Sequence, residues 1–316
     1  MKLSSWGNYP VVDAQLFDAS DEKLLHELLL KKTEITLRGN GRTYGDAALG
    51  KNILSCLNLN RIISFDKEQG ILTCESGVLL SDLLKLIIPH GWFLPVVPGT
   101  AKVSIGGAIS SDVHGKNHHH VGTFSNFVLS MDVMMSNGAL KTITEKSHAD
   151  LWSSICGGMG WIAVVLRATL KLKRIQSTNI QQQQLKATDI GYMMQLMLKH
   201  VSAEYSVAWL NASNTKNKIG AGVLFLGEHE NDNSKFKIKH SLNSEKKISD
   251  WIPPFVLNDF TASIFNRYYF SKHSDGKTTI QNLQQYFFPL DAVNNWNKLY
   301  GKNGMIQYQF VVPLAK

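Results

Sequence analysis

The sequence is poor in cysteine. Its 316 residues include three, Cys56, Cys74 and Cys156. Their odd number and their spacing fit neither a zinc site nor a disulfide framework. Cys56 and Cys74 stand in apolar, strand-like segments, where we expect buried, reduced thiols.

Long hydrophobic runs are also missing. Phe127–Met135 and Leu79–Ile88 are among the longest, and each is interrupted by polar or charged residues, so neither could span a bilayer. The first residues lack the apolar stretch of a secretion signal. We therefore expect a cytoplasmic protein whose contact with a membrane, if any, is peripheral.

Acidic residues are outnumbered by basic ones. The chain has 33 Lys and Arg against 25 Asp and Glu, a formal net charge of +8. A basic balance favours an anionic partner. Because there is no long basic run and no nucleic-acid-binding motif, we expect no nucleic-acid partner. The phosphates of a cofactor, a phosphorylated substrate or an anionic membrane surface remain as candidates.

The sequence does contain a series of short strands and helices. Asp21–Lys32 has the apolar stripe of an amphipathic helix. Asn137-Gly138 separates two apolar segments and predicts a tight hairpin turn. Ala149–Ile155 is typical of a helix and Ile162–Lys173 of a long strand. The first 170 or so residues are therefore predicted to be of the α+β class.

The composition changes after Ile175. The polar run Gln181–Gln184 predicts a boundary, and the polar stretch Glu228–Asp250 predicts an exposed loop. The alternating residues Ile306–Pro313 predict a final strand. We therefore expect two domains, residues 1–175 and residues 176–316.

Glycine gathers at four connections. The first, Gly39–Asp46, follows the predicted strand Glu34–Arg38 and would let backbone N–H groups turn towards an anion. It matches neither the dinucleotide fingerprint nor the P-loop. The other three are Pro98–Ala108, Ser110–His120 and Gly157–Gly160. Together they favour an extended, phosphate-bearing cofactor that is wrapped by backbone.

Histidines cluster in the third of these segments. His114, His118, His119 and His120 raise the question of a metal, but no carboxylate or thiol completes a familiar ligand spacing. We therefore expect no metal site. His114 is the better functional candidate, because a neutral imidazole can orient a substrate hydroxyl or move its proton.

Five segments resemble one known family. They are Arg38–Asp46, Pro98–Thr100, Gly106–Ile109, Asp112–His119 and Ile306–Phe310. They are similar to the decaprenylphosphoryl-β-D-ribose 2′-oxidase family, in the vanillyl-alcohol oxidase superfamily of FAD enzymes. The resemblance implies a PCMH-type FAD-binding domain of two α/β subdomains, followed by a substrate domain with an antiparallel sheet. The family continues beyond the last segment, so we expect the substrate domain to be incomplete at its C-terminus.

The resemblance also implies which residues contact FAD. They are Gly39, Asn40, Gly41, Arg42, Thr43, Tyr44, Gly45, Asp46, Pro98, Gly99, Thr100, Val103, Gly107, Ala108, Val113, His114, Gly115, Asn117, His118, Gly122 and Val164. Relatives that attach FAD covalently often have a histidine where this chain has Arg42. The resemblance therefore implies noncovalent FAD.

A catalytic set and a substrate follow from the same resemblance. His114, Lys116 and Gln309 would be catalytic, and Tyr44, Gln307, Leu290 and Phe287 would contact the substrate. The implied substrate is a polyprenylphosphoryl-β-D-ribose, a lipid-linked sugar phosphate, oxidised at its 2′-hydroxyl to the keto sugar. An NAD(P)-dependent keto-sugar reductase is the implied partner and would complete the epimerisation to the arabinose form.

Two residues depart from the family's pattern. Val207 stands where the family tends to have serine, and Phe287 where it tends to have tyrosine. One alternative is therefore an FAD-dependent sugar-lactone or alditol oxidase or dehydrogenase. Another is an inactive, truncated flavin-binding protein, because the family's usual catalytic lysine lies beyond the segments present here.

Overall fold

A small parallel sheet lies near the start of the chain in the computed structural model, which describes residues 1–19, 22–31, 34–212, 219–231 and 258–309. Its strands are ordered β3 (Gln15–Asp18), β5 (Asn52–Ser55) and β4 (Thr36–Arg38), and both pairs are parallel. Helix α1 (Glu22–Lys31) connects β3 to β4. A short hairpin of β1 (Lys2–Ser4) and β2 (Val11–Asp13) precedes the sheet. Because β4 ends at Arg38, the sheet fixes where the first glycine loop begins.

A five-stranded antiparallel sheet follows, in the order β10-β9-β11-β7-β6. Its strands are β6 (Ile62–Asp66), β7 (Ile71–Glu75), β9 (Val128–Met134), β10 (Leu140–Ile143) and β11 (Val164–Lys171). The hairpin predicted at Asn137-Gly138 is confirmed, and Gly138 takes the left-handed conformation with φ of 79°.

Helices and short turns cover this sheet and share its main hydrophobic core. They are α2 (Leu80–Ile87), η1 (Ile88–His90), α3 (Ile105–Ser110), α4 (His118–Val121), η2 (Phe124–Phe127) and α5 (Ala149–Ile155). The helix predicted at Ala149–Ile155 is confirmed. Cys56 and Cys74 are buried and unpaired, as predicted.

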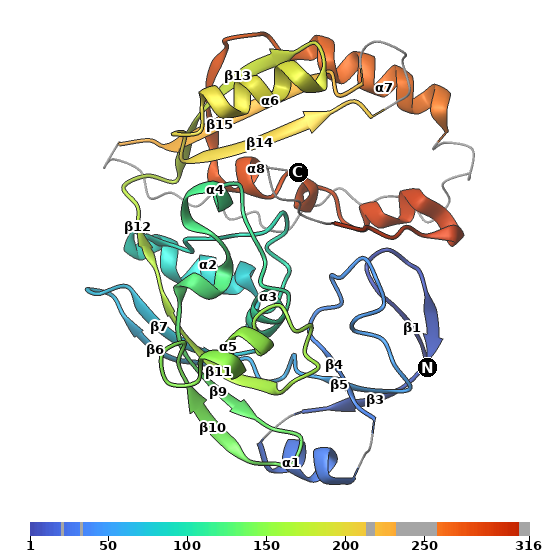
Figure 1. Cartoon of the computed structure of the whole chain (residues 1–316), viewed down its shortest axis with the longest axis vertical. Helices are drawn as coiled ribbons and strands as arrows, with labels where there is room; N and C mark the ends of the chain where they lie inside the picture. Colours follow the sequence, from blue (N-terminus) through green and yellow to red (C-terminus); the bar gives the residue numbers. More distant parts are fainter. Residues whose placement is uncertain (20–21, 32–33, 213–218, 232–257, 310–316) are drawn as a thin grey trace.

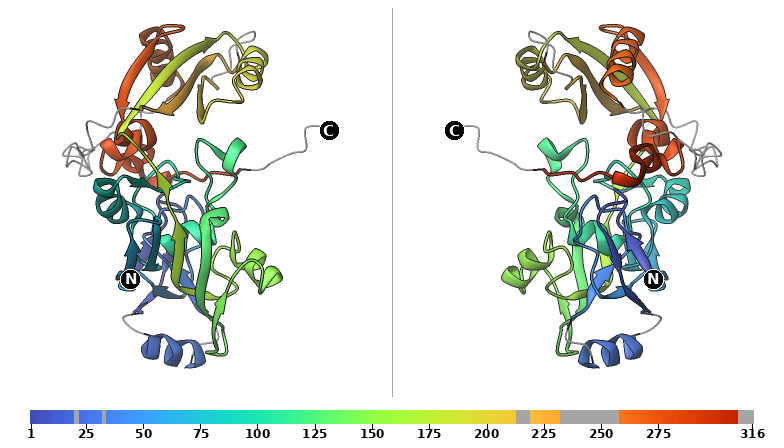
Figure 2. Two further views of the ribbon diagram at one scale, coloured as in Figure 1. Left: turned by 90° about the vertical axis from the view of Figure 1, so that its left-hand side faces the viewer. Right: turned by 90° about the vertical axis from the view of Figure 1, so that its right-hand side faces the viewer.

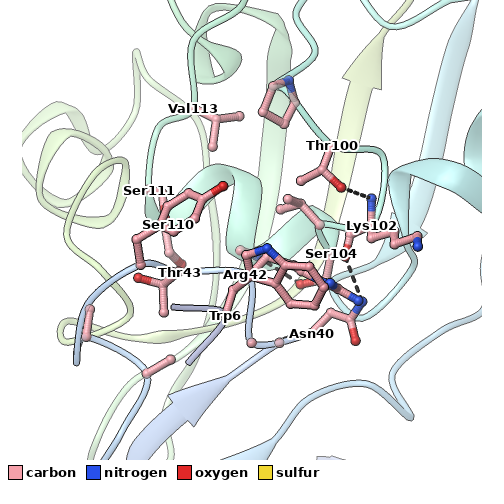
Figure 3. Close-up of a pocket in the computed structure, with 18 of the residues that line it drawn as sticks. Trp6, Asn40, Arg42, Thr43, Thr100, Lys102, Ser104, Ser110, Ser111 and Val113 are labelled. Atoms are coloured by element: carbon pink, nitrogen blue, oxygen red, sulfur yellow. Dashed lines mark hydrogen bonds between the residues drawn. The ribbon is translucent and has the colours of Figure 1, made fainter. Parts of the chain in front are cut away.

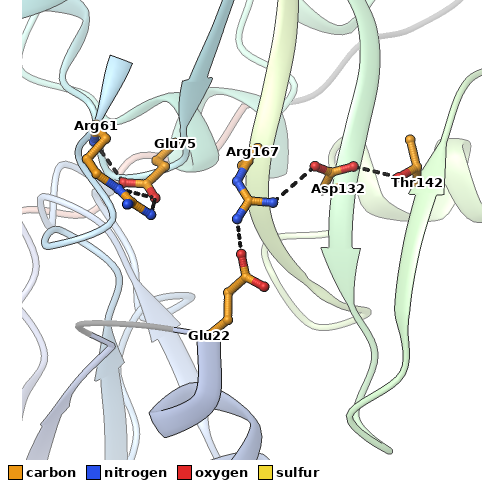
Figure 4. Close-up of polar contacts among 6 residues, drawn as sticks. All are labelled: Glu22, Arg61, Glu75, Asp132, Thr142 and Arg167. Atoms are coloured by element: carbon orange, nitrogen blue, oxygen red, sulfur yellow. Dashed lines mark hydrogen bonds and ion pairs between the residues drawn. The ribbon is translucent and has the colours of Figure 1, made fainter. Parts of the chain in front are cut away.

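An ion pair connects the larger sheet to helix α1 (Figure 4). Arg167 on β11 pairs with Glu22 at the start of α1 and with Asp132 on β9, the latter at 3.4 Å. The buried carboxylate of Glu75 accepts from Nε and Nη2 of Arg61 at 3.0 and 2.7 Å. The Arg167–Glu22 pair fixes α1 against the larger sheet, and the Arg61–Glu75 pair fixes the residue before β6 to β7.

A four-stranded antiparallel sheet forms the second half, with the order β14 (Tyr205–Leu210), β15 (Gly222–His229), β13 (Asn179–Ala187) and β16 (Thr278–Asn282). Helix α6 (Ile190–Lys199) packs Met193 and Leu196 on one face. Helix α7 (Asp259–Lys272) reaches the other face, where the ring centroids of Tyr269 and Trp209 are 4.7 Å apart. Figures 1 and 2 show α6, α7 and this sheet at the end of the molecule opposite α1.

The polar run Gln181–Gln184 was predicted to be a boundary, and this is wrong. It lies inside β13, which is hydrogen-bonded to β15 on one side and to β16 on the other. Gln182 and Gln184 are buried. Composition misleads here because a strand paired on both sides satisfies its backbone whatever its side chains are.

Two other polar or terminal predictions are only partly within the described residues. Glu228 and His229 end β15 instead of opening the loop predicted at Glu228–Asp250, and residues 232–250 lie outside the described part. Ile306–Gln309 belongs to no strand, so that part of the predicted final strand is wrong, and residues 310–313 are not described.

Within the described residues, two segments lead the chain between the halves. Strand β12 (Lys173–Arg174) pairs with β8 (Trp92–Phe93) on the way out. The return is made by α8 (Leu283–Phe287), η4 (Pro289–Ala292) and η5 (Trp296–Asn303), and Figure 1 shows this segment between the two halves. The division into residues 1–175 and 176–316 stays a prediction, and the described contacts place the segment after α8 against the first half. Among the helices in the described stretches, none is long and apolar enough to cross a bilayer.

Candidate active site

A cavity of about 700 Å³ lies between the first glycine loop, α3 and the returning segment (Figure 3). This volume is in the range of small-molecule and cofactor sites. The predicted site residues on its wall are Gly39, Asn40, Gly41, Arg42, Thr43, Tyr44, Gly45, Asp46, Pro98, Gly99, Thr100, Val103, Gly107, Val113, His114, Val164, Leu290, Gln307 and Gln309. The structure thus brings together most of the predicted cofactor residues and five of those predicted to be catalytic or to contact the substrate.

The other predicted residues lie outside this wall. They are Ala108, Gly115, Lys116, Asn117, His118, Gly122 and Phe287. Asn117 is 2% exposed and donates to the carbonyl of Pro95 at 2.8 Å, which holds the loop that carries His114. A Cβ on Gly115 would lie 2.9 Å from the Val97 carbonyl oxygen, so this glycine permits a close backbone approach.

The first glycine loop is held by Arg38. Its two terminal nitrogens donate to the carbonyls of Ser4 at 2.8 Å and Ala48 at 3.2 Å. Gly41 has φ of +60°, and a Cβ there would lie 2.2 Å from the Arg38 guanidinium. Arg38 is therefore used to build the loop.

Arg42, in the same loop, is held differently. Its guanidinium lies over the Trp6 ring, 3.9 Å from the ring centroid. Its Nε is buried without a hydrogen-bond partner among the described residues. Burial lowers the pKa of Arg42, an effect opposed by the charge of Asp291. Arg42 therefore lies on the cavity wall with its guanidinium stacked on Trp6.

Three sets of hydrogen bonds fix the second glycine loop, Pro98–Ala108. Thr100 and the backbone N–H of Ala101 both donate to Asp291, at 2.6 and 2.8 Å. Asn40 donates to the Lys102 carbonyl at 2.7 Å, which joins the first loop to the second. Ser104 caps α3 by accepting from the N–H of Gly107. These bonds present the backbone of both loops to one cavity.

His114 lies at another part of the same cavity. Its Nε2 is 3.4 Å from Nε2 of Gln309, the arrangement of an amide that donates to an unprotonated imidazole nitrogen. Partial burial and the neighbouring His118 lower the pKa of His114. Its neutral form is therefore favoured, and a neutral imidazole can accept a proton from a hydroxyl.

The side chain of Lys116 contacts helix α8, where the chain returns from the second half to the first. Its Nζ donates to the Phe287 carbonyl at 3.1 Å, and burial lowers its pKa to about 8. Phe287, predicted to contact the substrate, is 1% exposed and packs against Phe93 and Tyr205. Its apolar ring therefore fills the space between the two halves and does not contact the cavity.

The remaining histidines are tied to backbone. Rings of His119 and His120 both reach the Ala203 carbonyl, at 3.0 and 3.1 Å. Within the part of the chain that the structure describes, no group of three or more His, Cys, Asp or Glu is placed to hold a metal.

The cavity suits a phosphate-bearing group such as FAD. Ideal Cβ atoms at Gly45 and Gly99 would meet nothing within 4 Å, so both loops expose bare backbone to open space. Arg42 adds an unpaired cationic donor. Backbone N–H groups and a planar guanidinium are the groups that bind phosphates.

Several wall residues were missed from the sequence. They include Trp6, Lys102, Ser110, Ser111, Met159, Gly160, Asp291 and Trp296. The glycine cluster Gly157–Gly160 was predicted to help wrap the cofactor, without named contact residues, and the structure places its Met159 and Gly160 on the wall. Trp6, Asp291 and Trp296 carry no local motif, and only the fold brings them to the cavity.

Comparison with known proteins gives two kinds of similarity. Residues 22–144 match the model of an FAD binding domain. The chain is 31% identical over 336 aligned residues to decaprenylphosphoryl-beta-D-ribose oxidase of Mycolicibacterium smegmatis, and the match covers 99% of this chain and 71% of that protein.

Two other relatives match less than half of this chain. The L-gulonolactone oxidase of Mus musculus is 29% identical over 45% of this chain and 32% of its own length. The D-lactate dehydrogenase of Archaeoglobus fulgidus is 27% identical over 45% of this chain and 34% of its own. These two matches thus cover about a third of each relative.

Proposed function

Because the chain belongs to the decaprenylphosphoryl-β-D-ribose oxidase family of FAD-dependent oxidoreductases, we propose that it oxidises the 2′-hydroxyl of a polyprenylphosphoryl-β-D-ribose. The product would be the 2′-keto sugar. A partner reductase that uses NAD(P)H would then give the arabinose epimer. Since the prenyl chain would hold the substrate at a bilayer, the proposal includes peripheral contact with a membrane surface.

One observation carries this proposal. The two glycine loops and the pair His114–Gln309 lie on the wall of a single cavity, so a cofactor and a sugar can meet there. Bound FAD would supply the two-electron acceptor for the oxidation. FAD is proposed to be noncovalent, because Arg42 is no nucleophile for attachment.

The residues of this chain would orient the sugar and move its proton. His114, favoured as the neutral form, would accept the proton of the 2′-hydroxyl. Gln309 would hold the imidazole in place through the 3.4 Å contact between their nitrogens until the sugar hydroxyl replaces the amide at His114 Nε2, the nitrogen that accepts the proton. Holding the reacting carbon in one position accounts for a large part of such a rate enhancement.

Two measurements test the proposal. A visible absorbance spectrum before and after heat denaturation should show a flavin that is released into the supernatant. Turnover should then be measured with farnesylphosphoryl-β-D-ribose and with L-gulono-1,4-lactone. Oxidation of the lactone alone would refute the lipid-linked substrate and favour the sugar-lactone alternative.

His114 gives the residue-level test. The His114→Ala variant should bind FAD as the wild type does and lose about 10²–10⁴-fold in turnover. His148→Ala is a matched control, because His148 lies before α5 and not on the cavity wall. Unchanged turnover in His114→Ala would remove this residue from the reaction.

A further inference from the structure

Trp6 is held on four sides. Its backbone N–H donates to the Thr43 carbonyl at 2.9 Å, and its backbone carbonyl accepts from the side-chain amide of Asn297 at 2.8 Å. The edge of its ring meets Trp296 at a centroid distance of 6.0 Å and an interplanar angle of 71°. Arg42 covers its face. The ring is therefore fixed by the first glycine loop and by η5 together.

Stacking on a fixed ring determines where Arg42 points. A guanidinium on an aromatic face keeps its N–H groups in its own plane, free to donate sideways. Figure 3 shows the Trp6 ring and Arg42 overlapping on the cavity wall. The Nε of Arg42 has no protein partner among the described residues.

The neighbouring carboxylate does not satisfy this cation. Both oxygens of Asp291 accept from the second loop, through Thr100 and Ala101. Because Arg42 lies on the cavity wall, an anionic acceptor in the cavity would offset the cost of its partly buried charge. Phosphate oxygens match the planar donors of a guanidinium.

We propose that Trp6 is a positioning residue, which holds the Arg42 guanidinium towards a phosphate ester bound in the cavity. The inference rests on the proposed function, which offers two phosphate esters: the pyrophosphate of FAD and the phosphate of the lipid-linked sugar. It adds a role for a residue that lies outside every glycine-rich motif.

The test measures binding in a double-mutant cycle of Trp6→Leu and Arg42→Ala. Flavin-free protein is titrated with FAD and with riboflavin, which lacks phosphate, and FAD-loaded protein is titrated with farnesyl phosphate. Trp6→Leu should weaken binding of one phosphate ester about tenfold and leave riboflavin unchanged. In the Arg42→Ala background, Trp6→Leu should have no further effect.

Matched variants separate positioning from folding. Trp6→Phe retains a ring under the guanidinium and should recover most of the affinity. Arg42→Lys keeps the positive charge but loses the planar guanidinium. It should bind the phosphate ester nearly as weakly as Arg42→Ala does. Trp161→Leu is the control, since Trp161 is 77% exposed and lies just after Gly160 on the cavity wall. If Trp6→Leu does not fold, Trp6→Phe and Arg42→Lys carry the same test.

The ligand whose binding weakens identifies the phosphate ester that Arg42 contacts. Weakened FAD binding assigns Arg42 to the pyrophosphate, and weakened farnesyl phosphate binding assigns it to the substrate. If wild type binds FAD and neither ligand responds to Trp6→Leu, or if riboflavin weakens equally, this inference fails while the proposed function stands. If wild type binds no phosphate ester, both fail.

Discussion

Asp291 holds Thr100 through a 2.6 Å hydrogen bond between the carboxylate and the threonine hydroxyl. The second carboxylate oxygen accepts from the backbone N–H of Ala101 at 2.8 Å. These residues are 191 and 190 positions apart in the sequence. One buried carboxylate thus fixes the second glycine loop to the returning segment. Its removal should lower the stability of the fold.

The Asp291→Ala variant should lower the free energy of unfolding by about 1–3 kcal/mol, because it leaves the buried Ala101 N–H without an acceptor. Urea denaturation measures this loss. Asp82→Ala is the control, since its pair with Lys85 is exposed and should be worth less than about 1 kcal/mol. Equal stability of the two variants would contradict a structural role for Asp291.

Two glycines of the cavity wall should differ in how much stability they lose on substitution by alanine. A Cβ on Gly39 would lie 2.3 Å from the Ser104 hydroxyl, so Gly39→Ala should cost about 1–3 kcal/mol through overpacking. A Cβ on Gly99 would meet nothing within 4 Å, so Gly99→Ala should change stability by at most about 0.5 kcal/mol. Thermal unfolding of both variants and of the wild type measures these changes. A Gly39→Ala variant as stable as the wild type would contradict the predicted clash with Ser104.

The pH dependence of turnover should report His114. Its pKa is lowered by burial and by His118, so the active neutral form should persist below the ordinary histidine pKa and be lost as the pH falls further. Replacing His118 with alanine removes one of the two causes. The acidic limb of the kcat/KM profile should then move to higher pH. A limb that stays in place would mean that another group controls it.

Lys116 should make stability depend on pH at the alkaline side. Burial lowers its pKa to about 8, so the unfolded chain binds more protons than the folded one between that value and the ordinary lysine pKa. The cost of its ammonium is present below pH about 8 and is relieved as the pH rises. Lys116→Met should therefore be more stable than wild type near neutrality, by about 1–3 kcal/mol.

The comparison of denaturation at neutral and alkaline pH tests this sign. The advantage of Lys116→Met should shrink as the pH approaches the ordinary lysine value. Lys141→Met, at an exposed position on the edge strand β10, should show no such change. An advantage that grows with pH would contradict the burial of the ammonium.

Local sequence signals predicted the parts of the fold that local chemistry controls. Asn137-Gly138 formed its hairpin because its glycine reaches a positive φ that other residues resist. Gln181–Gln184 was misread, because the pairing of β13 on both sides depends on strands distant in sequence. The start of the first glycine loop was predictable from the end of β4, whereas the return of η4 and η5 was not.

The candidate site divides in the same way. Gly39–Asp46 and Pro98–Thr100 could be found because glycine loops are visible in sequence. Trp6 and Asp291 could not, since a tryptophan or an aspartate has no signature until its partners are known. Phe287 lies in the core, where its ring packs against Phe93 and Tyr205, and no local signal in the sequence shows these contacts.

The contact between Trp6 and Asn297 also sets an order of assembly during translation. The two residues are 291 positions apart, so a ribosome must add about that many residues before this wall of the cavity can close. At about 5–20 residues per second, the wait is roughly 15–60 s. During that interval the first glycine loop can form on its sheet, but Trp6 has neither Asn297 nor Trp296 to hold it. A nascent chain would therefore complete this wall of the cavity late, after η5 has left the exit tunnel.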